Sequence, residues 1–396
     1  MTTTPSADID QIIAALWTVL PRDGAPLGLH EPEFGANDRA YVLDAIDSTF
    51  VSSVGPYVDR FEKGLADYTG AKRAIAVVNG TAALHIALLV AGVEPGDEVL
   101  TPSLTFIATA NAISYCGARP LFVDSSDINL GLDPEKLAAG LTETAEIKNG
   151  QCYNRKTGAR IAAIVPMHTF GHPVDMDSLL AVAQRWCLPI VEDAAESLGS
   201  FYKGKHTGRF GLVGTLSFNG NKVLTTGGGG AIITDDEKIA DRIKHLTTTA
   251  RQKHAWAFMH DAIGYNYRLP NLNAALGFAQ LERLAKAVNE KRALAARYKT
   301  AFASIPGVRF VDEPPQTQSN FWLNALLLAT DSTQLLTPLL EKTNAAGLGT
   351  RPVWTLMHKL PMYATCQRMD VSVAEDLERR LINLPSSPRL GRSYAA

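Results

Sequence analysis

Short apolar runs alternate with longer amphipathic stretches along most of this 396-residue chain. Continuous runs of Val, Ile, Leu and Ala are typical of strands buried on both faces, whereas apolar positions three and four residues apart are typical of helices. The alternation predicts an α/β fold, with a mostly parallel seven-stranded sheet flanked by helices. The predicted strands are Ile75–Val78, Glu98–Leu100, Leu121–Val123, Ile161–Val165, Ile190–Val191, Gly214–Phe218 and Ala231–Thr234.

The amino-terminal segment predicts an amphipathic helix. Its acidic residues Asp8 and Asp10 stand where a secretion signal would be basic. We expect the helix to dock on its own subunit or on a partner, because one side of it is apolar. A second helix is predicted to run through Ser48 with Asn37 or Asp38 as its cap. The apolar stripe of the first helix comprises Ile9, Ile12, Ile13, Leu16, Trp17 and Leu20.

Beyond the seventh strand the pattern predicts a smaller α+β domain. We expect an amino-terminal helical arm over residues 1–30, a large domain over 31–270 and a small carboxy-terminal domain over 271–396. The polar segment Glu143–Arg160 predicts a surface hairpin or loop. The later elements are predicted as helices Glu237–Thr248 and Leu272–Tyr298, a strand near Phe321–Leu328, and helices near Leu335–Ala346 and Ala374–Ile382.

Composition narrows the class of protein. A hydrophobic content of 46% with 20% charged residues is ordinary for a soluble enzyme. The net charge of −2 gives no electrostatic reason to bind nucleic acid or a membrane surface, and no apolar run is long enough to span a bilayer. The four cysteines have no CxxC pairing, so we expect reduced thiols in a cytoplasmic protein. They are Cys116, Cys152, Cys187 and Cys366.

Two strand ends carry the most informative chemistry. The strand Gly214–Phe218 leads through Asn219-Gly220-Asn221 to Lys222, and the strand ending at Val191 leads to Glu192 and Asp193. Pyridoxal phosphate needs an amine for a Schiff base with its aldehyde and an acid that keeps its ring nitrogen protonated. A single lysine is more often a solvated charge, and Asn-Gly is often a hairpin turn. The prediction therefore rests on the combination.

A third strand end adds an anion site. The strand Ile75–Val78 runs through Asn79 and Gly80 into a segment of strong helix formers. Backbone N–H groups at a helix start attract anions, and Thr81 adds a hydroxyl donor. Phe106 follows another strand end and can stack on a flat cofactor, with core packing as the alternative. In open sheets of this kind ligands gather at the carboxyl ends of the strands.

No metal site is predicted. His168 and His172 have i, i+4 spacing, but they follow the strand Ile161–Val165 and straddle Gly171. A loop near the active site is therefore the preferred interpretation.

From about Leu29 to Pro388 the chain resembles the fold-type I, pyridoxal-phosphate-dependent sugar aminotransferases of the DegT/StrS group. The motifs occur in the order that this family has. They are Phe50–Glu62, Asn79–Thr81, Glu192–Glu196, Ser217–Gly230, Gly264–Leu269 and His358–Tyr363.

The resemblance implies a role for each matching residue. Lys222 would hold the cofactor and later move a proton, and Asp193 would pair with the ring nitrogen. Phe106 would pack on the ring. Asn266 would reach the phosphate of a neighbouring subunit in a homodimer with shared active sites. The phosphate would be bound by Thr81, Ala82 and Ser217, with further cofactor contacts from Gly80, Glu196 and Asn219.

Arg351 and His358 match the substrate side of the family's site. Arg351 can meet a diphosphate through paired charge-assisted bonds, with a rim salt bridge as the equal alternative. Lys222 stands where a related dehydratase branch has histidine, which argues against that branch.

The loop around Lys222 suggests a subgroup. Its Asn219-Gly220-Asn221 run and the four glycines Gly227–Gly230 look like the legionaminic-acid (LegC-type) and bacillosamine-pathway enzymes. This resemblance implies amination of a UDP-linked 4-keto-6-deoxy-N-acetylhexosamine by L-glutamate, for surface polysaccharide synthesis. Two alternatives stay open: a transaminase for a GDP-linked 4-keto-6-deoxyhexose, as in perosamine formation, and a cofactor-binding regulator without turnover.

Overall fold

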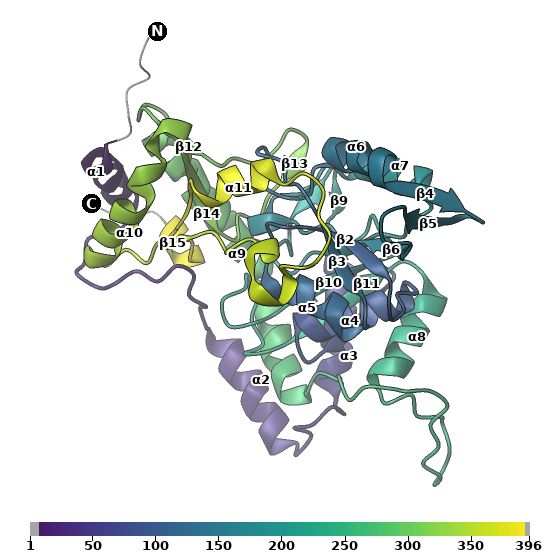
Figure 1. Cartoon of the computed structure of the whole chain (residues 1–396). Coiled ribbons are helices and arrows are strands. Elements are labelled where there is room, and N and C mark those ends of the chain that lie inside the picture. The colour runs from purple at the N-terminus through teal and green to yellow at the C-terminus, as the bar shows by residue number, and fades with distance from the viewer. Residues whose placement is uncertain (1–7, 393–396) are drawn as a thin grey trace.

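The computed structural model describes residues 8–392 and confirms the α/β class with a mostly parallel seven-stranded sheet (Figure 1). Two hydrogen-bonded groups of strands are joined by parallel bridges, Ile164 to Ile190 and Met167 to Asp193. Six strands run in one direction, and β11 is antiparallel to both of its neighbours. The spatial order is β1 (Arg73–Val77), β11 (Gly230–Thr234), β10 (Val213–Ser217), β7 (Val191–Asp193), β6 (Arg160–Ile164), β2 (Glu98–Pro102) and β3 (Arg119–Val123).

Helices cover both faces of this sheet because successive strand residues point to opposite sides. On one face, Ile75, Val99 and Ile232 share a core with α4 (Gly80–Val90), α5 (Ile107–Tyr115) and α8 (Glu237–Thr247). On the other face, the alternate residues of β1, β10 and β11 pack on α3 (Pro56–Thr69) and α9 (Asn271–Phe302). The same face of β2, β3 and β6 packs on α6 (Pro134–Thr144) and α7 (Met176–Arg185).

The amino-terminal helix docks on its own chain. In α1 (Ile9–Val19) the stripe residues Ile12 and Leu16 are buried in a core that α9 and α10 (Leu336–Ala345) share. The second helix, α2 (Ala36–Asp47), begins two residues earlier than a cap at Asn37 would place it. The expected cap at Asn37 or Asp38 is wrong, because Gly35 is the cap residue and the Asp38 carboxylate accepts its backbone N–H from inside the first turn.

A second, antiparallel sheet has the order β12 (Val308–Phe310), β14 (Asn324–Leu328), β16 (Leu381–Leu384) and β15 (Arg351–Pro352). The prediction of helix through Ile382 is wrong: α11 (Ser372–Glu378) ends earlier, and Ile382 pairs with Leu326. The segment forms a strand because β16 pairs with β14 on one side and with β15 on the other. The strand predicted from Phe321 begins at Asn324, because Phe321 has a left-handed φ of 48° that cannot continue a strand.

The remaining elements are short. The predicted polar hairpin is present as β4 (Ala145–Lys148) and β5 (Gln151–Asn154), joined by Asn149 and Gly150 with φ of 51° and 75°. No helix within residues 8–392 is long and apolar enough to cross a membrane. The domain boundaries stay a prediction. Three two-residue strands form a further three-stranded sheet: β8 (Phe201–Tyr202), β9 (Lys205–His206) and β13 (Thr317–Gln318). The 3-10 helices are Thr169–Gly171, Thr330–Leu335, Met357–Lys359, Pro361–Tyr363 and Pro388–Gly391.

Candidate active site

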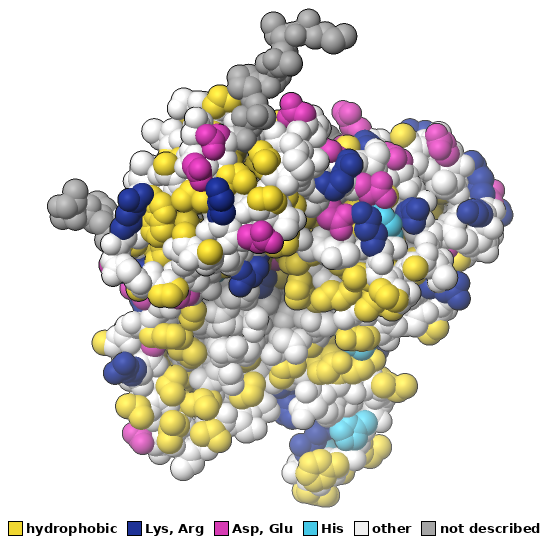
Figure 2. Space-filling model, turned by 60° about the vertical axis from the view of Figure 1, so that its left-hand side comes forward, with side chains coloured by type: hydrophobic (Ala, Val, Ile, Leu, Met, Phe, Trp, Pro, Cys, Tyr) yellow, Lys and Arg dark blue, Asp and Glu magenta, His cyan; other side chains and the backbone are white. Residues whose placement is uncertain are grey.

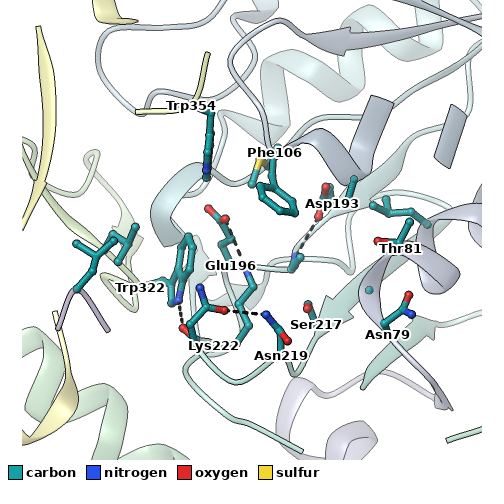
Figure 3. A pocket seen from close by; sticks show the side chains of 18 of the residues that line it. Asn79, Thr81, Phe106, Asp193, Glu196, Ser217, Asn219, Lys222, Trp322 and Trp354 are labelled. Carbon is teal, nitrogen blue, oxygen red and sulfur yellow. Dashed lines mark hydrogen bonds and ion pairs between the residues drawn. The ribbon is translucent and has the colours of Figure 1, made fainter. Parts of the chain in front are cut away.

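A cavity of about 650 Å³ lies where the large sheet meets the antiparallel sheet of β12, β14, β16 and β15, which is called the small sheet below (Figure 3). Its walls come from the carboxyl ends of β7 and β10, from the start of α4, and from residues beside β14 and β15. This position is the usual one for ligands in open α/β sheets. The predicted site residues that line the cavity are Gly80, Thr81, Phe106, Asp193, Glu196, Ser217, Asn219, Lys222 and Arg351.

Lys222 is presented by the loop that follows β10. The loop is closed by a bond from the Lys222 N–H to the Asn219 carbonyl (3.0 Å) and one from the Thr226 N–H to the Phe218 carbonyl (3.0 Å). The Lys222 side chain is only 12% exposed. Its Nζ lies 3.3 Å from Glu196 Oε1 and 3.8 Å from the centroid of the Trp322 ring. An amine is thus aimed into the cavity from a fixed loop.

Asp193 is the last residue of β7, and its carboxyl group is buried. Thr109 Oγ1 donates to Oδ2 (2.7 Å) and the Ala195 N–H donates to Oδ1 (3.2 Å). Burial raises the pKa of Asp193, while these bonds and the Lys222 charge oppose the increase. A carboxylate in this condition is stabilised by a cationic N–H brought into the cavity, as a protonated pyridine nitrogen would be.

The neighbouring carboxylate, Glu192, accepts hydrogen bonds on both of its oxygens from groups within the fold. Its oxygens accept backbone N–H groups of Gly208, Phe210 and Gly211, and His168 Nε2 lies 3.0 Å away. The Val174 N–H donates to His168 Nδ1, so Nε2 carries the imidazole proton. Burial works against ionisation, but the bonds from His168 and the backbone hold the pKa of Glu192 below its usual range. Both ring nitrogens of His168 are therefore hydrogen-bonded within the fold. Of the two adjacent acids Glu192 and Asp193, Asp193 is the one that lines the cavity.

The start of α4 supplies the anion end of the cavity. Gly80 and Thr81 line it together with Ser217, whereas the Ala82 N–H is taken by the Oδ1 of the cap residue Asn79 (2.7 Å). A Cβ on Gly80 would stand 2.9 Å from Ser217 Cβ, so only glycine lets the helix start approach β10 this closely. Free N–H groups at this terminus favour a phosphate.

Glu196 lies on the loop after β7 and is almost fully buried. Its Oε2 accepts the Phe170 N–H (2.9 Å), and its Oε1 faces Lys222. Burial raises the pKa of Glu196 to about 7, although the Lys222 charge opposes this. Phe170 has a left-handed φ of 55°, and its ring packs 5.2 Å from Trp354. Glu196 thus helps to hold a strained residue beneath the cavity wall.

Aromatic residues form the wall opposite the sheet. Phe106, directly before α5, lies 6.0 Å from Trp354 with an angle of 62° between the rings. Trp322 and Trp354 both line the cavity, and no strand-end motif in the sequence marked them. Thr109, the hydroxyl donor to Asp193, was also missed. The feature of the sequence that could have indicated Thr109 is its position in α5, the helix that follows β2, four residues after Thr105.

Three predicted residues do not line the cavity. The Ala82 N–H belongs to the helix cap, and His358 is buried against Ser103 Oγ (2.6 Å) and Glu375 (3.3 Å). Asn266 bridges to Thr248 at the base of the loop between α8 and α9. Arg351 lines the cavity, but its Nη1 donates to Asn344 Oδ1 and to the Thr350 carbonyl, both at 2.7 Å. The functional roles of these four residues stay predictions, as do those of the predicted residues that line the cavity.

A helix start for a phosphate, a buried acid and a directed lysine on one sheet edge define an α/β enzyme of the pyridoxal phosphate class. A model of the DegT/DnrJ/EryC1/StrS aminotransferase family matches residues 32–395, and the chain belongs to this family. The family, the aminotransferase activity and the pyridoxal phosphate cofactor expected from the sequence are thereby confirmed.

Named relatives cover nearly the whole chain. It is 38% identical over 370 residues to the GDP-perosamine synthase of Caulobacter vibrioides, covering 93% of this chain and 94% of that one. It is 37% identical over 364 residues to the GDP-perosamine synthase of Escherichia coli O157:H7, covering 91% and 93%. A crystal structure of a DegT DnrJ EryC1 StrS aminotransferase from Brucella abortus superposes with a TM-score of 0.81 at 28% identity, covering 89% and 90%.

The raised pKa of Glu196 predicts a pH-dependent cost to folding. Folding lifts this pKa from 4.5 to about 7, so the folded state keeps a proton that the unfolded state loses, and stability falls as the pH rises between these values. We expect Glu196→Gln to increase the free energy of unfolding by about 2–4 kcal/mol at pH 8 and to change it little at pH 4. Denaturant unfolding at both pH values tests this, and an equal effect at both would contradict it.

Proposed function

We propose that this aminotransferase moves the amino group of L-glutamate to C4 of a GDP-linked 4-keto-6-deoxyhexose. The observation that carries the reaction type is the placement of Lys222 Nζ in the same cavity as Asp193 and the start of α4. The GDP-linked sugar is supported by the two relatives named GDP-perosamine synthase. A UDP-linked 4-keto-6-deoxy-N-acetylhexosamine is the second candidate, because the Asn219–Asn221 run and the four glycines resemble enzymes that use such sugars.

When bound, pyridoxal phosphate supplies an aldehyde that exchanges amino groups and a ring that accepts an electron pair. The residues around it have separate tasks. Gly80 and Thr81 at the start of α4, with the Ser217 hydroxyl, bind the phosphate. Asp193 holds the proton on the ring nitrogen, and Phe106 covers the ring. Each of these groups orients the cofactor toward Lys222.

Lys222 performs the proton transfers. With the donor bound, neutral Nζ would take the proton from the carbon that carries the donor's amino group and deliver it to the cofactor carbon. With the sugar bound, Nζ would take a proton from the cofactor carbon and deliver it to C4 of the sugar. The aromatic wall of Trp322 and Trp354 limits the access of water to this amine. Arg351 at the rim would meet the diphosphate of the sugar nucleotide with guanidinium nitrogens other than Nη1, which donates to Asn344 and Thr350.

We further propose a cytoplasmic homodimer. Free thiols at all four cysteines suit a reducing compartment. The loop between α8 and α9 projects from the body and carries apolar side chains in the open (Figures 1 and 2). Trp256, Phe258 and Ile263 are 81%, 75% and 83% exposed. Exposed apolar groups in this number favour a protein partner, and Asn266 at the base of the loop is the residue expected to reach a neighbour's phosphate.

The dimer is tested on the projecting loop. We expect Trp256→Glu to shift the protein toward monomer, because a charge would be buried in the interface, while the exposed charge substitution Lys63→Glu leaves the assembly unchanged. Light scattering after size-exclusion chromatography gives both masses. A monomeric parent protein, or a dimer unaffected by Trp256→Glu, contradicts the proposed interface.

The role of Lys222 is tested by removing its amine. We expect Lys222→Ala to bind pyridoxal phosphate without the absorbance band of the lysine-bound cofactor, and to lose transamination by at least about a thousandfold, because the proton carrier is gone. Lys63→Ala, on an exposed helix face, should behave as the parent protein. Appreciable turnover in Lys222→Ala removes the mechanism.

The substrate is decided by a panel of GDP- and UDP-linked 4-keto-6-deoxy sugars. The protein is first converted to its amine form with L-glutamate and then mixed with each sugar, while the cofactor's absorbance reports the return of the aldehyde form. We expect the GDP-linked sugar to react at least about tenfold faster, which corresponds to 1.4 kcal/mol of preferential transition-state binding. Faster reaction of the UDP-linked N-acetyl sugar would assign the second candidate.

A further inference from the structure

The amine of Lys222 has two close partners, and the mechanism above gives neither of them a part in binding the protonated amine. On one side the Glu196 carboxyl oxygen Oε1 lies 3.3 Å from Nζ. On the other side the face of the Trp322 indole lies beneath Nζ, 3.8 Å from the ring centroid (Figure 3). A carboxylate and an indole face both attract a protonated amine, and the face of tryptophan is the strongest aromatic partner of a cation.

Trp322 is fixed independently of Lys222. Its Nε1–H donates to the Asn221 carbonyl (2.7 Å), and its backbone N–H donates to Asn320 Oδ1 (2.7 Å). Its carbonyl accepts Nζ of Lys291 (3.0 Å), a fully buried lysine on α9 that also donates to the Ser386 carbonyl. These bonds tie the indole to the Lys222 loop on one side and to the small sheet on the other.

Glu196 is also fixed. Its Oε2 accepts the Phe170 N–H, which leaves Oε1 directed at the amine. Both partners therefore keep their places when Nζ moves, and they form a preorganised position for it. Lys222 has no other ion pair among the described residues.

We propose that Glu196 and Trp322 are positioning residues that hold Lys222 in its protonated form between its two proton transfers. This inference rests on the proposed function. In the first half of the reaction the amine would take a proton from the donor's carbon and deliver it to the cofactor carbon, and in the second half it would take a proton from the cofactor carbon and deliver it to C4 of the sugar. In each half it is an ammonium between taking the proton and delivering it. The ammonium donates to Glu196 Oε1 and lies on the Trp322 face until the second transfer returns the neutral amine.

The other charged groups around Lys222 have partners of their own or are neutral, so they do not bind its ammonium. Asp193 has its own donors in Thr109 and Ala195. His30, behind the lysine, is buried, and burial holds its pKa well below the usual range, so it is neutral at physiological pH. Farther out, Glu33 and Glu290 pair with Arg283, Lys286 and Arg392. Glu31, on the same side, pairs with Arg389.

The interaction of the Lys222 ammonium with Glu196 depends on pH. Burial raises the pKa of Glu196 to about 7, so its carboxylate is present above this pH and is lost as the pH falls through it. The indole face is present at every pH. The two partners can therefore be separated by substituting each of them.

The experiment measures how fast Lys222 is acetylated by a trace of acetic anhydride in the full-length protein loaded with pyridoxamine phosphate. Only the neutral amine reacts, and peptide mass spectrometry gives the rate at Lys222. At pH 8 we expect Glu196→Gln and Trp322→Leu each to react about tenfold faster than the parent protein. Trp322→Phe keeps an aromatic face and loses only the bond to Asn221, so it should stay within about threefold. The exposed Lys63 should react equally in all four proteins.

Two comparisons decide the proposal. Rates at Lys222 within about twofold of the parent protein in both Glu196→Gln and Trp322→Leu overturn it, as does a Trp322→Phe rate equal to that of Trp322→Leu. The advantage of Glu196→Gln should also vanish at pH 6, where Glu196 is protonated in the parent. If Trp322→Leu does not bind the cofactor, the Glu196→Gln result decides alone. Conversion of the parent protein by L-glutamate is followed separately, and its failure would reject the proposed function without changing the labelling result.

Discussion

The parallel pairing of β7 with β10 is the constraint on which the site depends. Its register sets Asp193 opposite Thr215, so the acid at the end of one strand and the loop after the next strand meet at the same edge of the sheet. The Lys222 loop is held at this edge, because the Lys222 N–H donates to the Asn219 carbonyl and the Thr226 N–H donates to the Phe218 carbonyl. The close approach of Gly80 to Ser217 adds the start of α4 to the same edge. One strand pairing thus brings together an acid, an amine and an anion site.

Burial of these charges has a cost that neighbouring groups offset to different degrees. Glu192 is fully compensated by backbone N–H groups and His168, and it stays ionised without a ligand. Asp193 and Glu196 have fewer donors, and burial raises the pKa of both. Buried acids with few hydrogen-bond donors are stabilised when a cation approaches them, and a site for a cationic ring nitrogen and a lysine ammonium requires such acids. The left-handed Phe170, whose N–H donates to Glu196, shows that the loop after β6 also stores backbone strain.

Residues near strand ends could be predicted from the sequence, because the strand pattern fixes where they stand. Lys222, Asp193, Gly80 and Thr81 belong to that group, and they line one cavity. Trp322 and Trp354 could not be predicted, since they reach the cavity only through the packing of the small sheet on the large one. Ile382 shows the same limit at the level of secondary structure: pairing with β14 and β15 makes it a strand residue against its local helical pattern.

The central claim is that the ε-amine of Lys222 carries the cofactor. The most direct test is reduction of the holoenzyme with borohydride, followed by proteolysis and mass spectrometry of the peptides. We expect a pyridoxyl phosphate group attached at Lys222 and at no other lysine, and we expect it to be lost after prior incubation with L-glutamate. Attachment at a different lysine, or none at all in protein that retains the cofactor, would contradict it.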